Sequence, residues 1–212
     1  MADKQSVGEV YLKNVRLSFA ALFDKGKPIT DPKTGKVSDP KYKANFLIPK
    51  AGHSDYDDNA AANMRKLKDA GDQVKKAKWG DNIPKLKADR VCVRDGDEEN
   101  WEGYADCWYV SANNANQPVL VDRVKDANGK WIELTKENGG PKKLYSGCYV
   151  SAIVRLWAQD DPNYGKRINA SVESVQFFKH GDAFSGGKPV DPNEKFADVE
   201  EEEAAELDDD LI

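Results

Sequence analysis

The residues that build metal sites and disulfide frameworks are scarce in this sequence. Among 212 residues there are three cysteines and two histidines. Cys92, Cys107 and Cys148 are far apart and form no C-x-x-C pair, and His53 and His180 lack metal-ligand spacing. This usage argues against a disulfide framework, a zinc site or a metal cofactor. Because each cysteine lies in a strand-like run, we expect three buried, reduced thiols.

Long apolar runs and catalytic motifs are also missing. No stretch approaches the roughly 20 apolar residues of a membrane helix, and the first residues lack the apolar run of a secretory signal. We therefore expect a cytoplasmic protein with no membrane partner. The acidic residues lie in turns, at a helix start and near the C-terminus, and no H-x-E, P-loop or G-x-S-x-G pattern occurs. A nuclease needs carboxylates clustered on metal ions, so neither a nuclease nor another enzyme is expected.

The formal net charge of −5 averages two unlike regions. From Ala197 to Ile212 there are nine acidic residues and no basic one. Residues 1–196 hold the other 28 acids against 32 bases, which leaves them a net charge of about +4. The split indicates a body that binds anions and a separate acidic tail.

Short strand-like segments separated by turn sequences dominate the chain. The predicted strands span residues 8–19, 42–48, 87–94, 104–112, 119–125, 144–158 and 167–179. One helix is predicted over residues 55–70, capped by Ser54 or Asp55, with Gly71 as a possible end and a helical pattern that could continue to Lys78. This mainly β pattern with one inserted helix predicts a small barrel or sandwich in residues 1–185. Residues 186–212 have no apolar periodicity and are predicted to form a disordered linker and acidic tail.

The first two strands show which faces should be buried. Tyr11, Val15, Leu17 and Phe19 keep a period of two, which predicts a shared face. In the second strand, Tyr42, Ala44, Phe46 and Ile48 point one way, and Lys41, Lys43 and Asn45 point the other. Since strand side chains alternate between faces, one side can pack the core while the other offers two ammonium groups.

The segment from Leu144 to Ala158 is the most informative about function. One face is small and aliphatic and comprises Cys148, Val150, Ala152, Val154 and Leu156; the other comprises Tyr145, Gly147, Tyr149, Ser151, Ile153, Arg155 and Trp157. Flat rings on an outward face are stacking platforms for unpaired bases. The alternative is that a loop or the helix covers these rings as a second small core. Trp79, Trp101, Trp108, Tyr109, Trp131 and Tyr164 are further aromatic candidates whose faces the pattern does not assign.

Basic residues accompany these rings. Lys13, Arg16, Lys41 and Lys43 come from neighbouring predicted strands, and Lys85, Lys87, Arg123, Lys125, Lys142 and Lys143 lie at strand ends or in turns. Each one alone is typical of a solvated surface. Together with the rings, they supply what a groove for single-stranded nucleic acid needs, namely cations for phosphates and flat faces for bases.

The acidic tail ends in Asp208, Asp209, Asp210, Leu211 and Ile212. Its charge predicts an extended, solvated segment, and solubility alone does not explain the apolar tip. Such a tip suits docking in an apolar pocket with a basic rim on a partner protein. The tail can also fold back and compete with DNA for the basic groove.

Several segments resemble the phage single-stranded DNA-binding proteins. The matching residues are 42–50, 111–112 with 117–119, 144–150, and 174–179 with 181–182 and 186–187, and the more specific parts are Tyr-Ser-Gly-Cys-Tyr-Val at 145–150 and Val-Gln-Phe at 175–177. The likeness covers about residues 8–187. A more distant likeness links the chain to the acidic-tailed binding protein of T7-type phages. The family likeness implies an OB-fold, coating of single strands during phage replication or recombination in the infected host, and a tail that contacts replication enzymes. The T7-type likeness adds the expectation of a homodimer, although those tails end in an aromatic residue and this one ends in Leu211-Ile212.

The resemblance and the residues together predict an OB-fold-like antiparallel β-barrel that binds DNA through Lys13, Arg16, Lys41, Lys43, Lys87, Arg123, Tyr145, Tyr149, Arg155 and Trp157. Two other functions stay open at this point. One is a strand-annealing recombination mediator that works as a large ring, and the other is an adaptor whose tail is the whole function.

Overall fold

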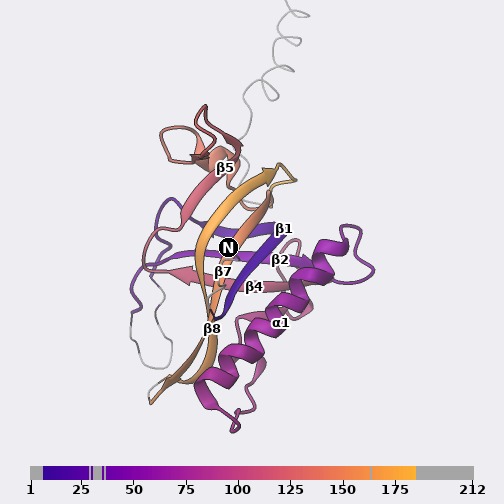
Figure 1. Cartoon of the computed structure of the whole chain (residues 1–212), viewed down its shortest axis with the longest axis vertical. Helices are drawn as coiled ribbons and strands as arrows, with labels where there is room; N and C mark the ends of the chain where they lie inside the picture. Colours follow the sequence, from indigo (N-terminus) through magenta and orange to yellow (C-terminus); the bar gives the residue numbers. More distant parts are fainter. Residues whose placement is uncertain (1–6, 29, 31–34, 36, 163, 185–212) are drawn as a thin grey trace, which may run out of the picture.

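The computed structural model describes residues 7–28, 30, 35, 37–162 and 164–184 (Figure 1). Its strands are β1 (Glu9–Ala21), β2 (Tyr42–Pro49), β3 (Val93–Asp95), β4 (Cys107–Asn114), β5 (Val119–Lys125), β6 (Trp131–Glu133), β7 (Tyr149–Asp161) and β8 (Gly165–Lys179). The helices are α1 (Asp58–Trp79) and α2 (Gly140–Lys143), with 3-10 turns η1 (Ala88–Arg90) and η2 (Gly96–Glu98). The predicted domain boundary at residue 185 and the predicted tail lie outside the described residues.

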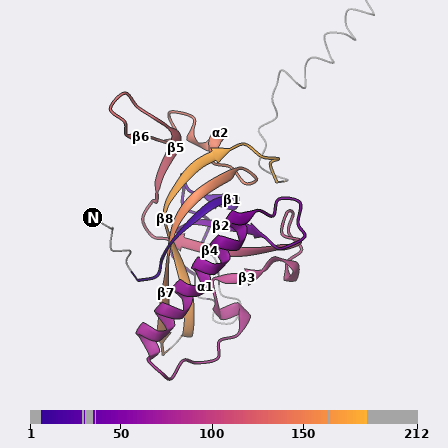
Figure 2. The same cartoon turned by 45° about the vertical axis from the view of Figure 1, so that its right-hand side comes forward.

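The described strands form one eight-stranded sheet in the order β3-β4-β2-β1-β7-β8-β5-β6. The sheet curls until β4 meets β8, where the Asn114 side-chain amide donates to the Val172 carbonyl at 2.9 Å. Val91, just before β3, also forms an isolated bridge with Ile168 of β8. Figures 1 and 2 show the long strands β7 and β8 wrapping over β1, β2 and β4. The fold is therefore mainly β with one main helix, as predicted, while a fully closed barrel stays a prediction.

One strand pair departs from the predicted antiparallel arrangement. β5 runs parallel to β8, with Leu120 opposite Val175. Between these two strands the chain forms β6, α2 and β7, and parallel neighbours require a long connection of this kind. β6 and α2 were not predicted, because segments of three and four residues are too short to show a period.

The inner face of the curled sheet holds the core. Val15, Leu17, Phe46, Val110 and Val150 are completely buried there. The inner face predicted for residues 144–158 is confirmed, since Cys148, Val150, Ala152, Val154 and Leu156 are all buried. Strand alternation therefore placed the core of β7 correctly.

Helix α1 lies along one side of the curled sheet and adds to the same core through Ala60, Leu67 and Val74 (Figure 2). It begins later than predicted, because the Asp57 carboxylate accepts the Ala60 amide at 2.9 Å and so provides the N-cap. It also continues through Gly71 to Trp79, as the longer of the two predicted ends allowed.

Strand β1 changes faces at two bulges. Its register with β7 shifts around Asn14, whose φ is 53°, and its register with β2 shifts around Phe19, whose φ is 47°. An inserted residue moves its neighbours to the other face of a strand. Tyr11 and Phe19 are therefore 43% and 46% exposed, whereas Val15 and Leu17 are buried. The predicted shared face was wrong for Tyr11 and Phe19.

The outer face, meaning the side of β1, β2 and β4 turned away from the core, is partly covered. A second apolar cluster lies on it and comprises Leu47, Tyr104, Cys107, Tyr109 and Phe184. Asn45, which was predicted to point outward, is 9% exposed because its amide donates to the Tyr104 hydroxyl at 2.7 Å. At the start of β2, Lys41 is exposed and Lys43 is half-buried.

Candidate nucleic-acid interface

The ten predicted DNA-binding residues do not form one patch. Strand pairing places Arg16 opposite Tyr149 and Lys43 opposite Ala21, on or beside the outer face. Trp157 lies eight residues further along β7 than Tyr149, which separates them by about 26 Å at the usual rise per residue. The others are dispersed: Lys41 just before β2, Lys13 in β1, Lys87 just before η1, Arg123 in β5, Tyr145 between α2 and β7, and Arg155 beside Trp157.

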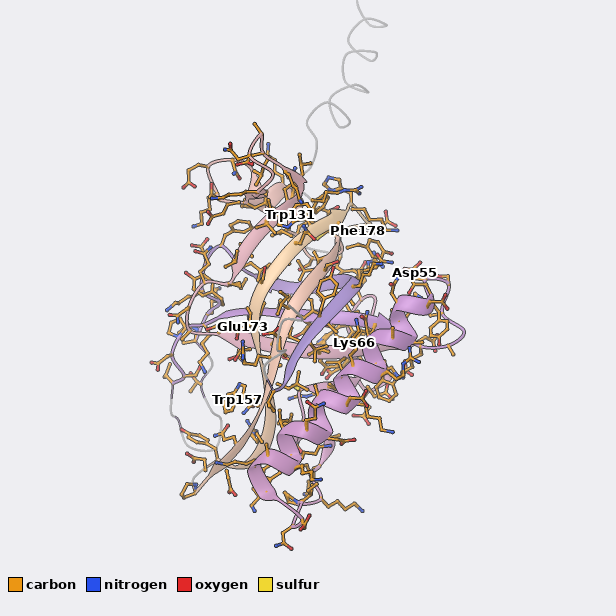
Figure 3. All side chains as sticks on the ribbon, viewed as in Figure 1. Asp55, Lys66, Trp131, Trp157, Glu173 and Phe178 are labelled. Carbon is orange, nitrogen blue, oxygen red and sulfur yellow. The ribbon has the colours of Figure 1, made fainter. Side chains whose placement is uncertain are left out.

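Arg155 is held by two carboxylates. Its guanidinium lies 3.1 Å from Glu9 of β1 and 3.6 Å from Glu173 of β8. Trp157, labelled in Figure 3, is 43% exposed. Its indole N–H donates to the Ser171 hydroxyl at 3.2 Å. Arg155, the cation two residues before Trp157 on the same strand, is therefore already paired with two carboxylates, which makes it a poor ligand for a phosphate.

Tyr145 and Tyr149 also have partners within the protein. The Tyr145 hydroxyl donates to the Gly181 carbonyl at 2.8 Å, and its ring stacks on His180. The Tyr149 hydroxyl donates to Asp55 at 2.6 Å, and burial together with this carboxylate raises the pKa of Tyr149 to about 12. Both rings are half-buried and engaged within the protein, and neither belongs to the second apolar cluster.

Arg16 fastens the last described segment across the outer face. Its guanidinium donates to the Gly147 carbonyl at 3.2 Å and to the Asp182 carbonyl at 2.8 Å. It also lies 4.5 Å from the centre of the Phe184 ring. Two carbonyl partners and a ring contact leave Arg16 less of its bonding capacity for a phosphate.

The outer face carries an aromatic platform, defined as Phe19, Trp101, Tyr104 and Tyr109. Phe19 and Trp101 meet edge to face at 4.9 Å, and Trp101 meets the buried Tyr104 at 5.0 Å. Tyr104 in turn packs on Tyr109 at 5.1 Å. Phe19 and Trp101 are 46% and 43% exposed, so two rings are presented to solvent on a support of buried rings. Such a geometry suits the stacking of unpaired bases.

Sequence reasoning missed half of this platform. Trp101 was among the aromatic candidates with no assigned face, whereas Phe19 was only grouped with Tyr11, Val15 and Leu17 by their period of two. A phenylalanine with positive φ is uncommon, and strained backbone of this kind concentrates at functional sites. The only signal in the sequence was the break in the period of residues 8–19. One sequence alone does not show that such a break is a bulge.

Polar and basic groups border the platform. Strand pairing sets Lys43 opposite Asn113 and Asn45 opposite Ser111. Lys43 lies against Gly26, whose amide donates to the Lys41 carbonyl at 2.8 Å. Gly26 thus contacts the Lys43 side chain and the Lys41 backbone, at the end of β2 where Lys43 pairs with Ala21.

A second group of cations and rings lies on β5, β6 and β8. Lys125 stands 4.5 Å from the centre of the Trp131 ring, and Arg123 stands 5.5 Å from that of Phe178. Figure 3 shows Trp131 and Phe178 at the same end of the molecule. Arg123 also donates to the Phe178 carbonyl at 2.9 Å, so this predicted residue has a structural contact as well.

The described residues offer little for metal or thiol chemistry. Within them, no group of three or more His, Cys, Asp or Glu side chains is arranged to hold a metal ion. The three cysteines are free and buried, as predicted. Burial raises the pKa of Cys92 and Cys148 to about 12 and that of Cys107 to about 11, which keeps the thiols protonated near neutral pH. No described helix is long and apolar enough to span a membrane.

Comparison with known proteins shows the family of this chain. The model of the Enterobacter phage Enc34 ssDNA-binding protein family matches residues 8–208. The chain belongs to this family. Protein p50 of Acyrthosiphon pisum secondary endosymbiont phage 1 is 38% identical over 206 residues, covering 94% of this chain and 98% of p50. The family resemblance inferred from residues 42–50, 144–150 and 174–179 is thereby confirmed.

Solved structures of the Enc34 protein share the fold. The single-stranded DNA-binding protein from bacteriophage Enc34 in complex with ssDNA is 25% identical, with a TM-score of 0.64, over 85% of this chain and 91% of that one. The same protein without the ssDNA gives a TM-score of 0.64 at 25% identity, over 90% of this chain and 91% of that one.

Proposed function

We propose that this chain coats single-stranded DNA without reading its sequence, during phage replication or recombination in the cytoplasm of the infected bacterium. The observation that carries the proposal is the Phe19–Trp101 pair, two half-exposed rings supported from below by Tyr104 and Tyr109. The family assignment and the likeness to the Enc34 protein bound to ssDNA support it. No catalytic step is part of this proposal.

In this mechanism the aromatic platform stacks bases and Lys41 and Lys43 neutralise phosphates. Each stacked base contributes roughly 1–3 kcal/mol, irrespective of its identity, because every base has a π-face. Lys13, Lys87 and Arg123 extend the path of the strand on either side. Arg16, Tyr145 and Tyr149 shape the surface through their bonds to the 180–184 segment and to Asp55. Hairpins melt by mass action, since single strands are bound better than duplex.

The test is a fluorescence-anisotropy titration of labelled oligo-dT and a matched duplex at several salt concentrations. Trp101→Ala should weaken oligo-dT binding about 5- to 150-fold, the loss expected for one stacked base. Trp157→Ala is the matched control, since that ring is also 43% exposed but lies among Glu9, Arg155 and Glu173. A larger loss in Trp157→Ala than in Trp101→Ala would move the interface to β7, where sequence alternation first suggested it. No binding by any form would make the adaptor function the leading one.

The acidic tail has its own part in the proposal. We propose that the end of the tail, Asp208-Asp209-Asp210-Leu211-Ile212, docks replication or recombination proteins, and that its charges compete with DNA for the cations of the body. Deleting residues 197–212 removes nine negative charges and should tighten oligo-dT binding. Looser binding would refute the competition. The proposal includes a homodimer, which light scattering of the full chain tests directly.

A further inference from the structure

A groove of about 450 Å³ lies between α1 and the β3 side of the sheet. Its apolar lining comprises Met64, Leu67, Val91, Val93, Leu156 and Ile168. None of the residues that line the groove belongs to the aromatic platform or its lysines. A ligand in the groove would therefore leave the proposed DNA surface uncovered.

Gly71 keeps this groove open. It is buried in the middle of α1 and lines the groove, yet a Cβ added there would meet nothing within 4 Å. Glycine is one of the least favourable residues in a helix interior. Here neither a positive φ nor a close neighbour requires it. The missing side chain leaves room in the groove for an apolar group from outside.

The rim of the groove is basic. Arg65, Lys68 and Lys75 of α1 line it together with one acid, Asp72. Lys75 pairs with Asp72 at 3.2 Å, so the charge presented by the rim comes from Arg65 and Lys68, which are both exposed. An apolar floor beneath two cations fits a short peptide that combines aliphatic side chains with adjacent carboxylates.

We propose that this groove binds the end of the chain's own acidic tail, with Leu211 and Ile212 on the apolar floor and Asp208 to Asp210 against Arg65 and Lys68. The tail ends in the two aliphatic side chains that the floor accommodates, and three consecutive carboxylates precede them.

The length of the chain allows this contact. Residues 185–212 follow the last described residue, and 28 extended residues reach roughly 90 Å, more than the width of a domain of this size. A chain of 28 residues that behaves as a random coil has a root-mean-square span of roughly 30 Å. Tethering raises the effective concentration of the tip to roughly the millimolar range, so a weak contact suffices to fill the groove. A partner protein would then have to displace the tip before docking the tail.

The test uses the full chain with the methionine methyl groups labelled with ¹³C. The chain has two methionines, Met1 and Met64, so the groove gives one of two signals. A nitroxide on Ala205→Cys should broaden the Met64 signal at low salt and release it at high salt. The three native thiols are buried with raised pKa, which directs the label to the new cysteine. An unbroadened Met64 signal at low salt would overturn the proposal.

Two groove variants and one mixing control locate the contact. Gly71→Leu should fill the groove and abolish the broadening, whereas Gly71→Ala, its matched control, should retain most of it. The surface variant Arg65→Glu/Lys68→Glu should also abolish it, without any change in the core. Broadening that persists in Gly71→Leu would overturn the proposal. Broadening that is seen only when spin-labelled chains are mixed with ¹³C-labelled chains would also overturn it, because the groove would then bind the tail of a second copy. Oligo-dT affinity is not a readout here, so failure would leave the proposed DNA binding intact.

Discussion

Replacing Phe19 by glycine and by alanine separates two roles of this residue. Phe19 lies in a bulge of β1 at φ 47°, a left-handed conformation that costs an L-residue about 1–2 kcal/mol. Glycine adopts it without that penalty. Both substitutions remove the ring, so the difference between them isolates the backbone, and their common effect isolates the ring.

The structure sets the expected magnitudes. The ring is 46% exposed, so its burial contributes about 1 kcal/mol, and its edge contact with Trp101 adds about 0.5–1.5 kcal/mol. Phe19→Ala loses both and keeps the strain, which predicts a loss of about 2 kcal/mol in the free energy of unfolding. Phe19→Gly recovers the strain, minus about 0.5–1 kcal/mol for the greater freedom of unfolded glycine, and should be more stable than the alanine variant by about 0.5–1 kcal/mol.

Urea unfolding followed by circular dichroism measures the two stabilities, and oligo-dT anisotropy measures the common loss of stacking. Both variants should bind about 5- to 150-fold more weakly than the natural chain, and about equally to each other. An alanine variant as stable as the glycine variant would refute the claim that the bulge holds residue 19 in a left-handed conformation. A tenfold difference in affinity between the two would show that the backbone at this position, and not the ring, determines binding.

Three further predictions concern single groups. Lys43→Gln should weaken oligo-dT binding and reduce the slope of log K against log salt by about 0.7. Arg155→Gln should change this slope little, because Glu9 and Glu173 already neutralise Arg155. Equal slopes for the two variants would contradict the prediction. Asp122 is buried, and although burial opposes ionisation, hydrogen bonds from Lys143 and the Arg123 amide lower its pKa. Asp122→Asn should therefore reduce the free energy of unfolding by about 2 kcal/mol at pH 7. The difference should shrink as the pH falls below about 4 and through the folded pKa, because the carboxylate of the natural chain is then protonated too; urea titrations at neutral and acid pH check this. Finally, the thiols of the folded chain should react slowly with a thiol reagent at pH 7.5, since burial raises the pKa of all three cysteines. The unfolded chain should react with three equivalents of the reagent. Rapid reaction of the folded chain would contradict the burial.

Local patterns predicted most of the strands, because strand alternation and turn residues act over a few neighbouring positions. The strand predicted over residues 87–94 was wrong for most of its length, since residues 88–90 form η1 and β3 begins at Val93. Residues 119–125 form β5 as predicted, and residues 8–19, 42–48 and 167–179 match β1, β2 and β8 to within two residues. The burial of alternate residues along β7 followed from the same period. The bulges at Asn14 and Phe19 escaped prediction because each reverses the period of its own strand, and Tyr11 and Phe19 were misplaced for that reason.

The position of Trp101 depends on tertiary packing. It lies between η2 and β4, in a segment without periodicity. It reaches the outer face because Tyr104 of the same segment packs on Tyr109, and the Tyr104 hydroxyl accepts a hydrogen bond from the Asn45 side-chain amide. These contacts join residues that no local pattern relates. The aromatic platform was therefore available to sequence reasoning only as a list of rings without faces.

Arg155 shows why residue type alone cannot rank cationic candidates. On sequence it stood beside Trp157 as a phosphate ligand, yet the carboxylates that surround it come from Glu9 of β1 and Glu173 of β8, strands brought to either side of β7 by the fold. Lys43 looked no stronger on sequence, but its strand neighbours are Ala21 and Asn113, which carry no charge. A cation attracts a phosphate in proportion to the charge that its neighbours leave uncompensated. The order of the strands in the sheet determines which residues those neighbours are. The proposal that the outer face of β1, β2 and β4 is the DNA surface thus rests on pairing across the sheet as much as on the rings that this face displays.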